Sequence, residues 1–201
     1  YIIKQPFNDA IKKYGIDIFM TLNAVYGNFT ITSIELDKKI HKPSFGKMYN
    51  MFGQVLSGAI YTIRSQKNII LNNKEKENYP QNINLIRSRK FVHKKKANEL
   101  LQSSYEKLNR KDTNCLNNFG YTGGRIINDK EWENIMYNLI NKIIKDKNMK
   151  DIDFESFVDI FIIRAVSYWN RTQRISAIDA EKIITNMSEN LRKKVLKMEE
   201  V

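Results

Sequence analysis

Apolar residues recur at helical spacing through almost the whole chain, and this pattern limits the fold more than any other feature. From Pro6 to Tyr26 they fall on one helical face, with Pro6 placed for a first turn. The same period returns in five later segments: 43–66, 97–108, 128–144, 154–169 and 176–198. The sequence therefore predicts an all-α bundle of about five to seven helices.

Local signals sharpen several of these helices. Asn128 is a good N-cap, and Glu131 follows at capping-box spacing. Either Asp151 or Asp153 caps the helix that runs to Trp169, which is apolar on nearly every side and is expected to lie at the centre of the bundle. Gly15 is expected to weaken the middle of the first helix by about 1 kcal/mol relative to alanine.

The chain of 201 residues is expected to form a single helical domain, 1–201, interrupted by polar segments. The Asn-rich stretch at about 72–84, which contains Pro80, predicts a long mobile loop. Residues 27–36 alternate like a strand, but a lone pair of strands is marginal, so a loop followed by a short helix is preferred. The glycines within 109–128 predict a flexible connector.

Most enzyme and metal chemistry lacks support in the sequence. Cys115 is the single cysteine, and His41 and His93 lie far from it along the chain, so neither a nucleophilic dyad nor a zinc site is predicted. The glycines of GYTGGR do not have the spacing of a phosphate-binding loop. In the segment 145–156 lysines and a methionine stand where an EF-hand needs carboxylates. We expect no catalytic residue, no metal and no cofactor.

Positive charge is the strongest chemical feature. The formal net charge is +12, and nine Lys or Arg stand against three Asp or Glu between Ile86 and Asp112. The predicted partner-binding cations in this run are Arg87, Arg89, Lys90, Lys94, Lys95 and Lys96. The run is either a solvated first stretch of the next helix or a mobile arm before it. A codon bias towards lysine would explain the same composition without any partner.

A second basic point surrounds aromatic residues near the end of the 154–169 helix. Arg164, Tyr168 and Trp169 are followed by Arg171 and Arg174, and the last two are also predicted to bind a partner. Such charge suits an acidic protein segment, nucleic acid or an anionic membrane surface. No apolar run reaches the ~18 residues of a membrane span. No RNP, KH, zinc-finger or zipper signature accompanies the basic residues.

Three stretches resemble the PHIST (PRESAN) domain of proteins exported by malaria parasites. In TITSIELDKKIHKPSFGKMYNMFGQV, residues 30–55, the family's MYNIWNQV-like arrangement is matched at Met48, Tyr49, Asn50, Gln54 and Val55, and Phe52 replaces its tryptophan. EWENIMYNLINKII, residues 131–144, resembles its Trp-opened helix, and FIIRAVSYW, residues 161–169, has a similar Phe-to-Trp spacing. The extra helix over 1–29, the insert at 170–180 and a last helix without tryptophan depart from the family.

The resemblance implies a helical docking domain without enzymatic activity. Members of that family are exported into the host erythrocyte, where they bind cytoskeletal proteins or acidic cytoplasmic tails of surface antigens. Together with the single cysteine, this favours a reducing compartment or the host-cell cytosol. Because Tyr1 is not an initiator methionine, we expect the chain to be part of a longer one.

We therefore expect a helical protein-interaction scaffold that presents a basic surface to an acidic protein partner. The alternative is a nucleic-acid-associated helical subunit of a ribonucleoprotein assembly. Peripheral contact with an anionic membrane is a further option, and the sequence does not define an oligomeric state.

Overall fold

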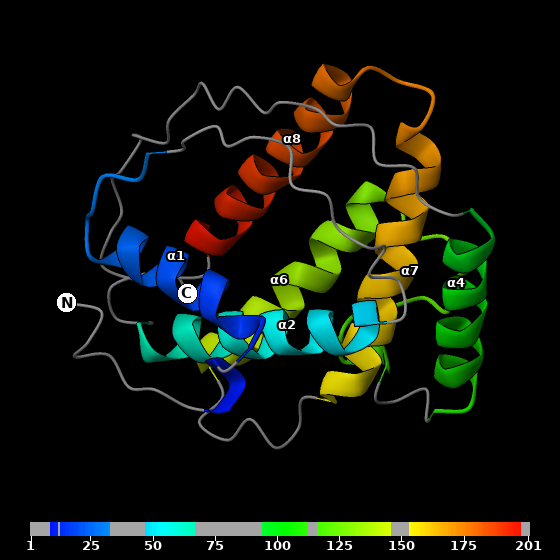
Figure 1. Cartoon of the computed structure of the whole chain (residues 1–201), viewed down its shortest axis with the longest axis horizontal. Helices are drawn as coiled ribbons and strands as arrows, with labels where there is room; N and C mark the ends of the chain where they lie inside the picture. The colour runs from blue at the N-terminus through cyan, green and yellow to red at the C-terminus, as the bar shows by residue number, and fades with distance from the viewer. Residues whose placement is uncertain are drawn as a thin grey trace. The chain divides into compact units, whose positions relative to one another are not determined.

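The structure, a computed structural model, describes residues 9–11, 13–32, 47–66, 94–111, 116–145 and 153–197. Within these ranges it contains six α-helices and no strand, which confirms the predicted all-α class (Figure 1). The helices are α1 (Gly15–Tyr26), α2 (Met48–Ser65), α4 (Lys94–Asn109), α6 (Asp129–Lys145), α7 (Phe154–Thr172) and α8 (Ala177–Leu196). A short 3₁₀ helix, η2, covers Asp9–Ile11.

The contacts group the chain into two compact units, Tyr1–Lys90 and Phe91–Val201. Each is described separately below. The expectation of one domain over the whole chain stays a prediction. The polar loop expected at about 72–84 lies outside the described residues.

In the first unit, α1 packs against α2 and begins later than the sequence predicts. The periodicity indicated one helix from Pro6, but Lys13 has a φ of 65° and separates η2 from α1, so Gly15 opens the helix rather than weakening its middle. The backbones of α1 and α2 approach closely here. A Cβ on Gly58 would lie 3.1 Å from the carbonyl oxygen of Gly15.

A buried polar pair ties the far ends of these two helices together. The Gln66 side chain donates to Asn23 Oδ1 at 3.2 Å, and Asn23 donates to the carbonyl of Phe19 at 2.9 Å. Both residues are almost fully buried, so the hydrogen bonds compensate the loss of water around their amides. The pair fixes how α1 and α2 align within the unit.

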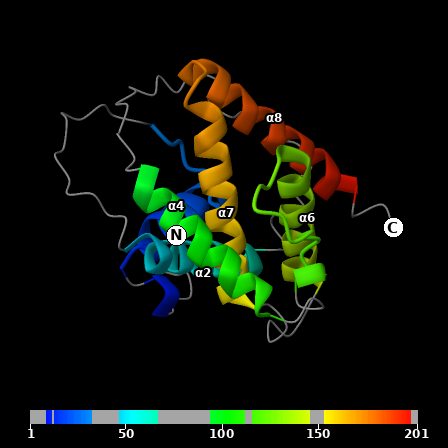
Figure 2. The ribbon, with the colours of Figure 1, turned by 90° about the vertical axis from the view of Figure 1, so that its right-hand side faces the viewer.

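The second unit is organised around α7, as the sequence predicted. Nine residues of α7 are buried, including Phe157, Ile160 and Ile163. Figure 2 shows α4 lying against α7 and α8 lying along α6, in agreement with the contacts between these helices. Asp153 caps α7, with its carboxylate accepting from the Ser156 amide at 3.1 Å, which decides between the two predicted caps.

Aromatic rings fill the space between α6, α7 and the segment before α6. Trp132 meets Phe161 edge-on with ring centroids 5.7 Å apart and lies 6.1 Å from Phe157. Phe157 in turn packs 5.4 Å from Phe119. Contacts of this geometry add to the burial of large apolar area. Trp132 and Phe161, which carry part of the family resemblance, are therefore packing residues of this core.

Two non-helical predictions have different outcomes. Residues 29–32 lie in neither helix nor strand, as expected for a loop, and the short helix expected after them lies outside the described residues. The 116–128 segment is packed rather than a solvated connector, because Leu116, Phe119 and Ile127 are buried. The glycine count indicated flexibility, but these apolar side chains anchor the segment to the core.

Candidate functional site

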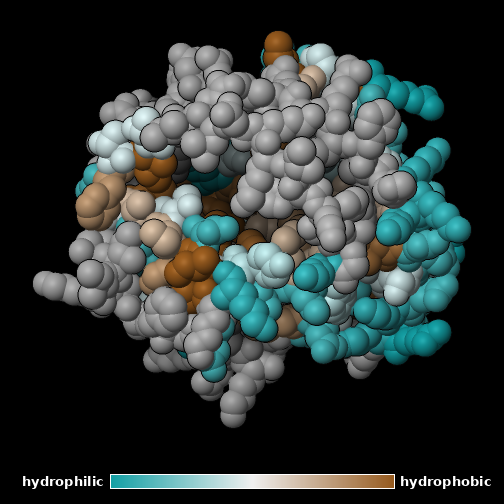
Figure 3. All heavy atoms as spheres, viewed as in Figure 1, coloured by the Kyte–Doolittle hydropathy of each residue, from teal (hydrophilic) through white to brown (hydrophobic). Residues whose placement is uncertain are grey.

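The predicted lysines Lys94, Lys95 and Lys96 form the first turn of α4, and all three are exposed. For these residues the structure favours the solvated helical stretch over the mobile arm. The other members of the predicted basic run, Arg87, Arg89 and Lys90, lie outside the described residues. Figure 3 shows hydrophilic residues gathered over the outward side of α4.

The electrostatics of this turn are unfavourable within the protein itself. A helix N-terminus carries a partial positive charge, so cations there are disfavoured, although solvent and salt screen most of the cost at exposed positions. α4 has no acidic residue in its first turn. Among the described residues, no carboxylate forms an ion pair with Lys94, Lys95 or Lys96. We refer to these three residues as the α4 lysine turn.

Lysines at the other end of α4 are engaged within the unit. Lys107 lies 3.9 Å from the buried carboxylate of Asp159, and Lys111, just beyond the helix, lies 2.9 Å from Asp153. Burial alone would raise the pKa of Asp153, but hydrogen bonds from Lys111 and Ser156 lower it to about 2. The positive charge at this end of α4 is thus compensated by acids of α7 and its cap, in contrast to the α4 lysine turn.

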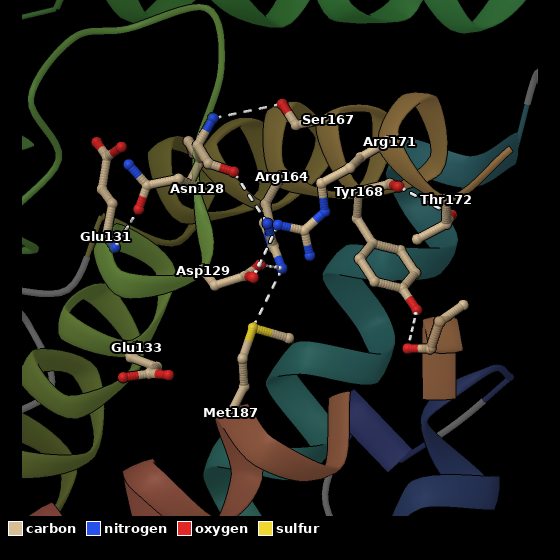
Figure 4. Close-up of polar contacts among 12 residues, drawn as sticks. Asn128, Asp129, Glu131, Glu133, Arg164, Ser167, Tyr168, Arg171, Thr172 and Met187 are labelled. Atoms are coloured by element: carbon tan, nitrogen blue, oxygen red, sulfur yellow. Dashed lines mark hydrogen bonds and ion pairs between the residues drawn. The ribbon is translucent and has the colours of Figure 1, made fainter. Parts of the chain in front are cut away.

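The second basic point is largely internal (Figure 4). The side chain of Arg164 is only 6% exposed and donates to the carbonyl of Ile127 at 2.9 Å and to Asp129 at 2.7 Å. It also contacts the sulfur of Met187 at 3.2 Å. This guanidinium links the segment before α6 to α7 and α8, and it is not available to a partner.

Arg171 shares the same carboxylate. Its guanidinium donates to the second oxygen of Asp129 at 2.8 Å, while 43% of the side chain stays exposed. Burial alone would raise the pKa of Asp129, but hydrogen bonds from Arg171 and Arg164 outweigh it and hold the pKa below its usual value. Arg171 therefore reaches solvent but already has an acidic partner. Arg174 is exposed, and no described carboxylate pairs with it.

The aromatic members of this cluster are also used internally. The Tyr168 hydroxyl donates to the carbonyl of Ala180 at 2.8 Å, and Arg164 lies 5.5 Å from the centre of the same ring. Burial raises the pKa of Tyr168. The sequence placed arginine beside aromatic residues correctly, but the arrangement joins α7 to α8 instead of forming an open surface.

An arginine–aromatic pair that the sequence did not indicate joins Arg125, in the segment before α6, to Tyr105 of α4. Arg125 stands 4.6 Å over the ring of Tyr105, and both residues reach solvent. A hydrogen bond from Asn109 and a smaller contribution from Arg125 hold the pKa of Tyr105 below 10, against the effect of burial. The basic residue of GYTGGR was the signal available in the sequence, but only the folded loop brings it to Tyr105.

The loop that carries Arg125, residues 120–127, is held at several points. Its start takes positive φ at Gly120 and Gly123, and the Tyr121 hydroxyl donates to the carbonyl of Gly124 at 2.6 Å. Burial raises the pKa of Tyr121 to about 12, so its hydroxyl stays a donor at neutral pH. At its other end the loop is closed by Ile127, whose amide donates to Ser167 Oγ at 3.3 Å.

The predicted capping residues of α6 also hold this loop in place. Asn128 Oδ1 accepts from the Glu131 amide at 2.9 Å, as the sequence predicted. The Glu131 carboxylate accepts from the amide and the hydroxyl of Thr122, at 3.3 and 2.8 Å. One end of the predicted capping box therefore fastens the loop to α6.

The cysteine and the histidines considered for nucleophilic or zinc chemistry are not among the described residues. These residues are Cys115, His41 and His93. Across the described ranges, no three side chains of His, Cys, Asp or Glu are grouped so that they could hold a metal ion. Nor does any helix in those ranges have the length and apolar character to cross a membrane.

Comparison with known proteins does not assign this chain to a family. No family model, curated protein or solved structure matches it.

Proposed function

We propose that the protein is a non-enzymatic helical interaction domain whose α4 lysine turn binds an acidic segment of another protein. One observation carries the proposal: Lys94, Lys95 and Lys96 are exposed, adjacent and without a described acidic neighbour, at the helix end that disfavours positive charge. An anionic partner would offset the unfavourable interaction of these lysines with the helix dipole. Binding such a partner would therefore stabilise the α4 lysine turn more than it would stabilise lysines scattered over the surface.

The distribution of acids within the second unit supports this assignment. Asp129, Asp153 and Asp159 are engaged by cations of the same unit, and Glu133 lies 3.6 Å from Lys194. These carboxylates are already paired within the protein. Long-range attraction to a partner carboxylate would speed association more than it would raise affinity, and added salt would screen it.

The finer proposal follows the family resemblance. A PHIST-like domain would dock on the host erythrocyte cytoskeleton or on the acidic cytoplasmic tail of a surface antigen, which agrees with a basic docking surface. The matched positions of α6 and α7 described above serve packing. These positions would therefore specify the fold of such a domain, whereas the α4 lysine turn would bind its partner.

The first test replaces all three lysines of the turn with glutamine. We expect affinity for a fluorescent oligo-glutamate peptide, measured by anisotropy at low salt, to fall about tenfold. The free energy of unfolding should stay within about 0.5 kcal/mol of the parent value, because exposed substitutions rarely do more. Any small change in this free energy of unfolding should be an increase, since the three positive charges no longer oppose the helix dipole.

A matched variant separates local binding from overall charge. Lys130, Lys193 and Lys197 are also exposed, and changing all three to glutamine alters the net charge equally. This control should bind the peptide almost as the parent does. If it loses as much affinity as the first variant, binding reflects net charge alone and the assignment of the α4 lysine turn is wrong.

A nucleic-acid-associated role is the second candidate, favoured by the exposed Arg125 on the Tyr105 ring. Arginine and aromatic faces together suit stacking on bases. Both candidates predict sensitivity to salt, so competition distinguishes them. If RNA or duplex DNA displaces the oligo-glutamate peptide more effectively than an unlabelled acidic peptide of equal charge, the nucleic-acid role is correct and the docking role fails.

A further inference from the structure

Among the described residues of the second unit, Ile126 is the most exposed large apolar residue, at 74%. Single exposed apolar side chains are common on protein surfaces and need no explanation by themselves. Ile126 differs because its neighbours on both sides are fixed: Arg125 lies over Tyr105, and Ile127 is buried and hydrogen-bonded through its amide to Ser167. An apolar side chain is thus presented to solvent from a loop held on both sides.

This rigidity matters for binding. A loop that is ordered before it meets a partner loses little conformational entropy on association, so more of the apolar contact appears as affinity. The loop is also hydrogen-bonded to α6 through Thr122 and Glu131. Ile126 therefore has the properties of an apolar anchor in a protein–protein interface.

The position of Arg125 relates this anchor to the α4 lysine turn. Lys94, Leu101 and Tyr105 stand seven and four positions apart, so they share one flank of α4. Lys94 and Tyr105 are about 16 Å apart along the helix axis at 1.5 Å per residue. Arg125 covers Tyr105 at the end of this flank, and Ile126 follows it directly in the chain.

The charges of the flank restrict what can occupy it. Within the described ranges neither Lys94 nor Arg125 forms an ion pair with a carboxylate. An extended peptide covers 16 Å in about five residues at ~3.3 Å each. An acidic segment could therefore place carboxylates at Lys94 and, at that separation, one apolar residue on Ile126.

We propose that the acidic partner segment carries an apolar side chain that packs on Ile126, about five extended residues from the carboxylates held at Lys94. This inference rests on the proposed docking function and specifies its partner further. The acidic residues bring the segment to the flank, and the apolar residue distinguishes it from other acidic sequences.

Two fluorescent peptides of equal charge test the inference on the full chain. Each has a run of glutamates and, about five residues on, either leucine or serine. We expect the leucine peptide to bind about tenfold more tightly, the usual effect of one buried apolar anchor. Ile126→Ser should abolish this advantage and leave the affinity for the serine peptide unchanged.

Ile178 supplies the matched control, because it is also an exposed isoleucine of the second unit, at 55%. Ile178→Ser should keep the tenfold preference for leucine. Both variants should have the circular dichroism melting curve of the parent, since neither side chain is buried. Equal affinity for the two peptides, or the same loss in both variants, overturns the inference.

The outcomes also separate this inference from the function beneath it. If both peptides bind equally and the α4 lysine-turn variant weakens both, docking of an acidic segment holds and the anchor is wrong. If neither peptide binds at low salt, the docking function fails and the anchor with it. Displacement of the leucine peptide by oligouridylate of equal charge, unaffected by Ile126→Ser, would assign the flank to nucleic acid and also overturn the inference.

Discussion

At the scale of single residues, Asp129 decides what the nearby arginines can do. One carboxylate accepts hydrogen bonds from both Arg164 and Arg171. Arg164 is nearly inaccessible to solvent, whereas Arg171 remains part exposed. A buried ion pair is disrupted at high cost when one partner is removed, so Arg164 and Asp129 are structural. Arg171 is already paired with Asp129, unlike the lysines of the α4 lysine turn.

Asp153 gives a pH-dependent prediction at the same scale. Its pKa is about 2 in the folded protein against an ordinary value of 3.8, so it contributes stability that is present above pH ~4 and is lost as the pH falls towards 2. Discounted for the partial exposure of the side chain, the contribution is about 1 kcal/mol. Denaturant titrations between pH 5 and pH 2 measure the loss.

The variant Asp153→Asn tests the cause of this loss. It removes the titrating carboxylate and its pairing with Lys111, while an asparagine still caps α7. We expect the variant to be less stable at pH 6 and to lose less additional stability on acidification. An unchanged pH dependence would show that other carboxylates cause the acid sensitivity.

At the scale of elements, the crossing of α1 and α2 brings Gly58 against the backbone of Gly15. A Cβ on Gly58 would lie 3.1 Å from the carbonyl oxygen of Gly15 and 3.2 Å from Cγ2 of Ile18. Backbone atoms of α1 cannot move aside as a flexible side chain can. The close approach therefore disfavours larger residues at Gly58, because α1 would have to shift by a few tenths of an ångström, even though glycine is a poor helix former.

Gly58→Ala is expected to destabilise the protein by about 1 kcal/mol. Overpacking at a tight contact costs roughly 2 kcal/mol, and the better helix propensity of alanine returns about 1 kcal/mol of it. Thermal unfolding followed by circular dichroism at 222 nm (a helix signal) measures the balance. A stabilised variant would mean that α1 shifts to accommodate the methyl group.

At the scale of the whole molecule, the described residues of the two units contribute very different numbers of buried apolar side chains. Within the described ranges, the fully buried apolar residues of the first unit are Ile11, Phe19 and Ile60. Those of the second unit come from α4, α6, α7 and the segment before α6, and include Phe119, Ile135 and Phe157. Because apolar burial is the main favourable contribution to folding, the second unit has the larger capacity to fold alone.

We expect residues 91–201, expressed alone, to fold cooperatively with helical circular dichroism. Residues 1–90 alone are expected to unfold at a much lower denaturant concentration, since few of the apolar side chains described in that unit are buried. If 91–201 shows no cooperative transition, its core needs the first unit and the chain behaves as the single domain that the sequence predicted.

The sequence alone determined the all-α class, the central place of α7 and the cap at Asn128, and it narrowed the cap of α7 to Asp151 or Asp153. These features depend on residues three or four positions apart, so helical periodicity and capping patterns are enough to find them. It misjudged the start of α1 and the 116–128 segment, because a left-handed Lys13 and buried loop side chains leave no periodic signal.

Only the tertiary structure decided which cations are free. Arg164 and Arg171 meet Asp129 across 35 and 42 residues of sequence, and Arg125 reaches Tyr105 on a different element. Local pattern predicts that a residue lies on a helix, but not which distant carboxylate neutralises it. The lysines of the α4 turn could be counted in the sequence, whereas their lack of a described acidic partner is a property of the fold.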